Sequence, residues 1–165
     1  MRFRYRVRLV GNVVNLTTVI GLVMAKAGKA QLHRRPHGVW LATGYRFKFP
    51  VASAFCVGNF LISHHDLDYL LARPRLLLHE ERHSWQYLLF IGPLYWPFYG
   101  IGMLWSMLRT GDRGSANPFE IAAGLADGGY PELPRRTWGE MGSALLRAPR
   151  AVMASLSDLR RRRAR

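Results

Sequence analysis

The 165-residue chain has a single cysteine, Cys56. One cysteine excludes an intrachain disulfide, a thiolate zinc finger and an iron–sulfur cluster held by four cysteines. A metal site in this chain therefore has to be built from histidine and carboxylate ligands. Acidic residues are scarce as well, because 10 Asp and Glu stand against 24 Lys and Arg, and the formal net charge is +14.

A chain this basic attracts anionic partners, either nucleic acid or an acidic membrane surface. The sequence has no aromatic–basic motif and no recognition helix of the kinds that nucleic-acid-binding domains use, so we expect no specific nucleic acid. The long apolar stretches favour an anionic membrane surface as the partner.

Charged residues are missing from residues 9–25, which follow the basic start "MRFRYRVRLV". We interpret residues 1–30 as a basic N-terminal segment that forms an uncleaved, membrane-contacting helix, with a buried core helix as the alternative. The alternation of Arg with apolar residues also fits a strand with one cationic face. Basic residues follow directly from Lys26 to Lys48, which places this region on the cytoplasmic side.

Residues 84–108 also carry no charge and are long enough to cross a bilayer. Pro93 and Pro97 interrupt the stretch, so we expect a bent pair of short helices that is re-entrant or lies at the membrane surface. Its aromatic residues resemble the set found at membrane interfaces: Trp85, Tyr87, Tyr95, Trp96, Tyr99 and Trp105.

Short runs rich in Val, Phe, Trp and Ile between residues 38 and 63 predict a small antiparallel sheet. Pro74 suits the first turn of a helix, which we expect to run to Phe90. A second helix should begin after Asn117, its N-cap, and end at Gly128–Gly129. Residues 131–165 form a basic amphipathic tail that either meets an anionic leaflet or stays solvated.

The stretch "LLLHEERHSWQ" contains the pattern H-E-x-x-H. On a helix, His79 and His83 are four residues apart and point their imidazoles to one side. Zinc accepts imidazole nitrogens, and a catalytic zinc has three protein ligands and a water. Glu120, in the second helix, is the candidate third ligand. Glu80 follows the first ligand and stands where a general base for the metal-bound water is needed.

H-E-x-x-H followed by an E-x-x-A helix resembles the gluzincin zinc peptidases. The chain also resembles a group of small bacterial proteins that carry H-E-x-x-H-x-x-Q and N-x-F-E-x-x-A-G-L-x-x-G-G-Y, and this likeness covers about residues 57–130. The gluzincin resemblance implies that His79, His83 and Glu120 bind zinc and that Glu80 is the base. Gluzincins often have an Asp four residues after the third ligand, where this chain has Gly124.

Three further residues are secondary candidates. Gln86 lies on the helical face of the two histidines and either hydrogen-bonds a ligand or, as we favour, packs as a polar neighbour. Tyr130 is a candidate donor to an oxyanion. A di-iron site would need a second E-x-x-H, and the sequence has none.

These features predict an α+β fold of minimal zincin-like type over residues 31–130. A small antiparallel sheet packs on the motif helix, a second helix carries the third ligand, and apolar helices contact the membrane. We expect a zinc-dependent hydrolase, most simply a metallopeptidase, at the cytoplasmic membrane face. Its peptide or protein substrate is not specified by the sequence. The alternative is a non-catalytic metal-binding or membrane scaffold protein.

Overall fold

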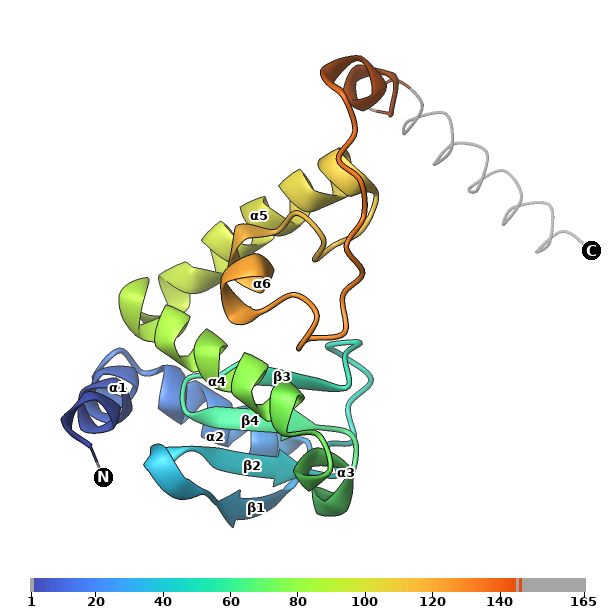
Figure 1. The fold of residues 1–165 in the computed structure, drawn as a ribbon. Coiled ribbons are helices and arrows are strands. Elements are labelled where there is room, and N and C mark those ends of the chain that lie inside the picture. The colour runs from blue at the N-terminus through green and yellow to red at the C-terminus, as the bar shows by residue number, and fades with distance from the viewer. Residues whose placement is uncertain (1, 145, 147–165) are drawn as a thin grey trace, which may run out of the picture.

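The computed structural model describes residues 2–144 and residue 146. Within these residues the chain forms an α+β fold with a four-stranded sheet (Figure 1). A further helix begins at Trp138 and runs at least to Ala144. The predicted Arg-rich end of the tail lies outside the described residues. The strands are β1 (Gln31–Arg34), β2 (Trp40–Thr43), β3 (Ala54–Val57) and β4 (Phe60–Ser63).

The sheet is mixed, which corrects the predicted antiparallel sheet. Its order is β1-β2-β4-β3, and the β2–β4 pair is parallel. The long loop 44–53 produces this order, because it carries the chain from β2 past the place that β4 later occupies, to the edge of the sheet where β3 forms. The chain then returns through a tight β3–β4 turn at Gly58, where φ is +61°. A Cβ at Gly58 would lie 2.5 Å from the backbone of Thr17, so only glycine fits there.

Helices cover both faces of the sheet, as Figure 1 shows for α4 and α2. Alternate residues of each strand point to opposite sides. Leu41 and Leu61 belong to the core beneath α4 (Pro74–Leu89). Ala42 and Ile62 belong to a second core beneath α2 (Thr17–Ala27). The predicted packing of the sheet on the motif helix is therefore confirmed, and so is the helix itself.

The N-terminal segment is helical, so the alternative strand interpretation is wrong. It forms α1 (Phe3–Val14) and α2, which meet at a bend of 73°. The uncharged stretch 84–108 is bent as predicted. It comprises the end of α4, a 3-10 turn (Gly92–Leu94) and α5 (Tyr95–Thr110), and the bend there is 112°.

No single helix within residues 2–144 has the length and apolar character needed to cross a membrane, although the two bent pairs pass this test on length and composition. A 3-10 turn (Pro36–Gly38) and two short α-helices complete the part of the fold that the structure describes. Asp66 caps α3 (Leu67–Leu71) and accepts a hydrogen bond from the N–H of Tyr69, and Asn117 precedes α6 (Pro118–Ala123).

Candidate metal centre

The α4 helix places His79 and His83 side by side, as their spacing predicts. Pro74 occupies the first turn of the helix, and Leu77 and Tyr87 anchor α4 in the core. The remaining helical face is polar yet buried, and it includes both histidines. Their Nε2 atoms lie 3.1 Å apart.

The short helix α6 brings Glu120 to the same point. Asn117 caps α6, because its Oδ1 accepts a hydrogen bond from the N–H of Phe119 at 3.1 Å, which confirms the predicted N-cap. Gly102 lets α5 approach this cap, since a Cβ there would lie 2.5 Å from Asn117 Oδ1. Glu120 Oε2 lies 3.1 Å from His79 Nε2 and 3.5 Å from His83 Nε2.

Hydrogen bonds on the outer sides of the three residues orient them. The Nδ1 of His79 lies 3.0 Å from the carbonyl oxygen of Gly124, which can only accept, so this nitrogen carries the proton. The amide nitrogen of Gln86 donates to the Phe119 carbonyl, and its Oε1 therefore faces His83 Nδ1 at 2.8 Å. Both Nε2 atoms are thereby left with a free lone pair.

The three atoms that face one another are His79 Nε2, His83 Nε2 and Glu120 Oε2. With both imidazoles neutral, this trio consists of acceptors and contains no donor. Tyr99 donates its hydroxyl hydrogen to Glu120 Oε1, whereas Oε2 is buried and has no hydrogen-bond partner. A tetrahedral zinc with bonds of about 2.0–2.1 Å would separate its ligand atoms by about 3.3–3.4 Å. The observed separations of 3.1, 3.1 and 3.5 Å are close to this value. The arrangement of His79, His83 and Glu120 fits a metal ion.

The electrostatics of the trio also favour a cation. Burial opposes ionisation of Glu120, but the imidazoles of His79 and His83 that lie against its Oε2 lower the pKa of the carboxyl to about 2. Burial alone would lower the pKa of His83, yet the adjacent Glu120 carboxylate and the charge of Glu80 raise it, so a positive charge is favoured at this point of the site. The Glu120 carboxylate therefore stays ionised at neutral pH, although only 2% of the residue is exposed.

Glu80 is buried beside the trio, with 4% of its surface exposed. Burial raises the pKa of its carboxyl, the nearby His83 and His79 lower it, and the Glu120 carboxylate raises it further. The residue is therefore within electrostatic reach of all three candidate ligands, although it is hydrogen-bonded to none of them.

The segment after α6 closes over the trio. The predicted helix to Gly128–Gly129 is wrong, because α6 ends at Ala123 and Gly124 turns the chain with φ of +90°. Arg82 stabilises this end, since its Nη1 donates to the Ala123 carbonyl and to Asp127 Oδ2. The turn presents the Gly124 carbonyl to His79 Nδ1, so a backbone carbonyl orients this imidazole.

The secondary candidates Gln86 and Tyr130 both lie at the site. Gln86 hydrogen-bonds a candidate ligand, so the favoured interpretation of a mere packing neighbour was wrong. The ring of Tyr130 lies 6.5 Å from that of His79, and burial is the main reason that its pKa rises to about 12. Tyr130 is thus near the site as a neutral hydroxyl.

The sequence did not identify Tyr95, Tyr99 or Gly128 as part of the site. Both tyrosines belong to the predicted membrane-interface set, whereas in the structure the Tyr95 hydroxyl lies 3.0 Å from His83 Nδ1 and the Tyr99 hydroxyl donates to Glu120 Oε1. Their four-residue spacing on a helix that follows the motif was the available signal. For Gly128, a Cβ would lie 2.4 Å from the His79 ring.

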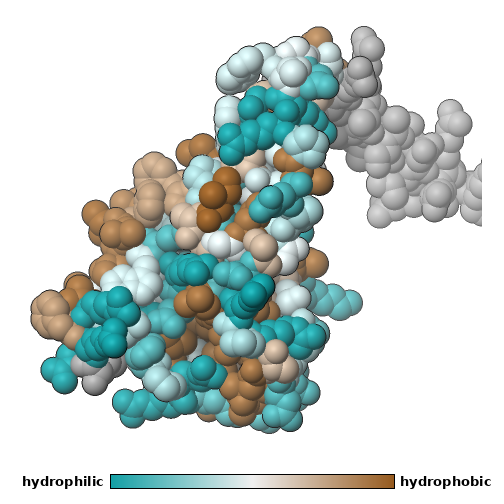
Figure 2. Space-filling view, in the orientation of Figure 1, coloured by the Kyte–Doolittle hydropathy of each residue, from teal (hydrophilic) through white to brown (hydrophobic). Residues whose placement is uncertain are grey.

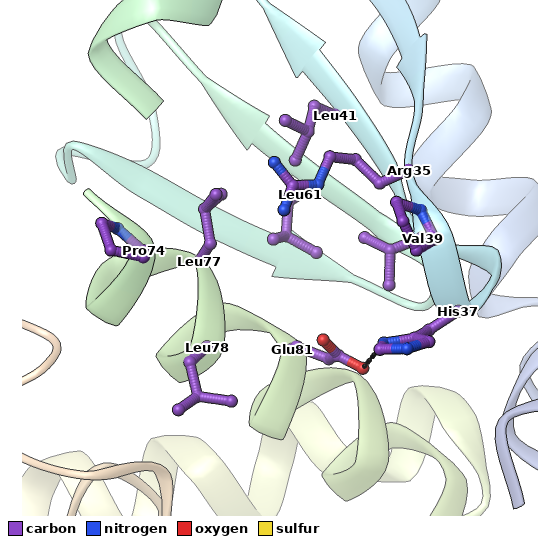
Figure 3. Close-up of a pocket in the computed structure, with 10 residues that line it drawn as sticks. Arg35, His37, Val39, Leu41, Leu61, Pro74, Leu77, Leu78 and Glu81 are labelled. Carbon is purple, nitrogen blue, oxygen red and sulfur yellow. Dashed lines mark ion pairs between the residues drawn. The ribbon is translucent and has the colours of Figure 1, made fainter. Parts of the chain in front are cut away.

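A cavity of about 260 Å³ lies on the other side of α4, against the sheet (Figure 3). Leu77 and Glu81 line it from the helix, and Leu41 and Leu61 line it from the strands. These helix positions are about half a turn from the two histidines, so the cavity is separate from the metal centre. In Figure 3, Glu81 points to His37, and its Oε1 is 3.9 Å from His37 Nδ1.

Comparisons with known protein families, with curated proteins and with solved structures found no match to this chain. The assignment of the site therefore rests on its geometry alone.

Proposed function

We propose that His79, His83 and Glu120 bind one Zn²⁺ and that the protein is a zinc-dependent hydrolase, most simply a metallopeptidase. The observation that carries the proposal is the convergence of three buried lone pairs on one point, with every outer atom of the same side chains already hydrogen-bonded. Such a cluster without a cation would be costly, because buried acceptors need a donor or a metal. Two imidazoles and one carboxylate form a ligand set that zinc commonly takes in enzymes.

Residues around the bound ion would act as base and as supports of the ligands. A bound zinc supplies a polarising charge and a water that ionises near neutral pH. Glu80, next to His79 in sequence and buried beside it, would accept the proton of the attacking water and pass it to the leaving group. Tyr99 would hold Glu120 Oε1 so that Oε2 alone faces the ion. Gly124 and Gln86 would fix the two imidazoles.

The depth of the site favours a second candidate, a metal-binding protein without catalysis. His79 and His83 are 2% and 7% exposed, and the two cavities described among residues 2–144 include none of the three ligands. A structural zinc site is closed in the same way, although it normally has four protein ligands rather than three.

Metal content tests the first half of the proposal. The detergent-purified full chain, loaded with zinc and desalted, should retain about one zinc per chain by mass spectrometry. His83→Ala and Glu120→Ala should lose it. His65→Ala is the matched control, because His65 is exposed, stacks on Tyr69 and is not one of the candidate ligands. A folded parent that retains no zinc, or equal zinc in all variants, would overturn the site.

Glu80→Gln tests the second half. The zinc-loaded parent should cleave members of a library of internally quenched peptides. Glu80→Gln should retain zinc and lose activity by at least about a hundredfold, as expected for removal of a general base. Glu132→Gln removes an exposed carboxylate and should keep full activity. Undiminished cleavage by Glu80→Gln would refute the mechanism, and a zinc-loaded parent that cleaves nothing would favour the non-catalytic candidate.

A further inference from the structure

The polarity of α1 is inverted relative to a helix of a water-soluble domain. Its buried residues are Arg8 and Asn12, both with 0% exposure. Arg8 donates to Glu81 at 3.2 Å and to the His37 carbonyl, and Asn12 donates to the Ser84 carbonyl at 2.8 Å. The opposite face is an exposed apolar stripe with helical spacing, made of Phe3, Val7, Val10 and Val14.

The α5 helix repeats this inversion. Its buried residues are Tyr95, Gly102 and Ser106, which are polar or small. Its exposed face is again an apolar stripe with helical spacing, made of Phe98, Ile101 and Trp105, and Leu94 in the preceding 3-10 turn continues it. Helices that face lipid follow this rule, because polar and small residues meet the protein while large apolar residues meet hydrocarbon.

The two bends of the chain meet at one place. Asn15, in the α1–α2 turn, donates to the Tyr87 carbonyl at 3.2 Å, and a Cβ at Gly92 would lie 2.7 Å from the Asn15 carbonyl oxygen. Around this contact lie five exposed aliphatic residues, which we call the apolar tip: Val14, Leu16, Leu89, Ile91 and Leu94. Figure 2 shows apolar side chains over α1 and along α5 on the same side of the molecule.

Two residues of the apolar tip hold unfavourable backbone conformations. Leu16 has φ of +68° and Ile91 has φ of +54°, which large side chains rarely adopt. They are nevertheless 60% and 70% exposed, so packing against the protein does not account for the choice of an aliphatic residue. Asparagine or glycine would suit either turn better in water.

Cationic residues lie at the start of α1 and at the end of α2, which are the ends away from the apolar tip. Arg2, Arg4 and Arg6 are exposed at the start of α1, and Lys26 and Lys29 are exposed at the end of α2. The only charged residue between Val7 and Ala25 is Arg8, which is buried against Glu81. An apolar tip with cations at its base matches a bilayer with anionic headgroups, since lysine and arginine are attracted to such a surface.

We propose that the apolar tip inserts into the hydrocarbon edge of an anionic lipid bilayer and that the two bent helix pairs enter and leave on the same side. The exposed stripes of α1 and α5 then face lipid, and their polar faces remain in protein contact. The basic ends of α1 and α2 lie at the headgroups. This inference rests on residues other than the metal ligands and stands independently of the proposed hydrolysis.

Flotation with vesicles tests the insertion. The full chain, diluted from detergent, should float with vesicles of phosphatidylcholine and phosphatidylglycerol. A Leu16→Asn/Ile91→Asn double variant should bind at least about tenfold more weakly, because two large aliphatic side chains no longer leave water. Asparagine tolerates the left-handed conformation, so this variant should fold and keep the parent's zinc content. Leu71→Asn/Leu133→Asn is the matched control, with two exposed leucines away from the tip.

The outcomes separate lipid from other occupants. Equal flotation of the parent and the tip variant would refute the proposal, and so would a parent that stays with the unbound fraction. A parent that self-associates without lipid or detergent, and that becomes monomeric in the tip variant, would assign the surface to a second copy instead.

A fluorescent label provides an independent measure of depth. Cys56 is buried, so a cysteine introduced as Val14→Cys can be labelled selectively with an environment-sensitive fluorophore. On vesicle addition its emission should shift to the blue and become protected from a water-soluble quencher. A label at Leu71→Cys should show neither change, and an unprotected label at position 14 would count against insertion.

Discussion

Gly128→Ala should damage zinc binding although the residue is not a ligand. The backbone at this position does not have a positive φ, so alanine is compatible with its conformation. Its Cβ, however, would lie 2.4 Å from Cε1 and 2.6 Å from Nε2 of His79. The methyl group would therefore press on the ring atom that faces the metal.

The size of the effect follows from these distances. An ordinary contact begins at 3.4 Å, so the methyl group and the His79 ring must move apart by the difference between 3.4 and 2.4 Å, which is about 1 Å. Metal ligands tolerate changes of only about 0.2 Å from their normal distances. We expect zinc affinity to fall by about 10–100-fold, which corresponds to roughly 1.4–2.7 kcal/mol.

Competition against a fluorescent zinc chelator measures this affinity, and thermal unfolding of the metal-free protein checks the fold. Gly100→Ala is the matched control, because no atom lies within 4 Å of the added Cβ and the position is inside α5. It should keep the parent's affinity and raise stability by about 0.5–1 kcal/mol. Parent-like zinc affinity in a folded Gly128→Ala protein would refute the assignment of Nε2 as the metal-facing atom of His79.

Two further changes test the surroundings of the site. Gln86→Leu removes one of the two hydrogen-bond partners of His83 Nδ1 and leaves only the Tyr95 hydroxyl, so it should weaken zinc binding about tenfold in the same competition assay. Gln31→Leu, at an exposed strand position, should not. Partial burial raises the pKa of Asp112, but the N–H groups of Ser115 and Gly114 donate to its carboxylate, and the net effect is a lowered pKa. A lowered folded-state pKa gives stability that is present above the unfolded value of about 3.9 and lost as pH falls through the folded value. Asp112→Ala should therefore cost about 1 kcal/mol at pH 6 and progressively less below about pH 4 in thermal unfolding; a cost independent of pH would contradict this origin.

The local parts of the site could be predicted because short-range geometry fixes them. Four residues of helix place His79 and His83 on one side whatever the remainder of the chain does. The N-cap at Asn117 and the first-turn Pro74 likewise follow from unsatisfied N–H groups at helix ends. The bend after α4 follows from its prolines and glycines.

Other features depended on contacts between distant segments. The parallel β2–β4 pair has no local signature, because it is set by where loop 44–53 returns the chain. The inverted polarity of α1 was hidden for the same reason: the alternation of arginines in sequence does not show that Arg8 alone meets Glu81, 73 residues away.

The sequence by itself determined the motif helix, the identities of the candidate ligands and the bend within the apolar stretch 84–108, whereas the 73° bend between α1 and α2 was not predicted. Only the tertiary structure decided how the ligands are oriented. His79 Nδ1 finds its acceptor 45 residues along the chain, at a glycine carbonyl that no side-chain pattern indicates. Spacing along one helix is set by covalent geometry, whereas the meeting of α4, α5 and the turn after α6 is set by packing, which no short stretch of sequence contains.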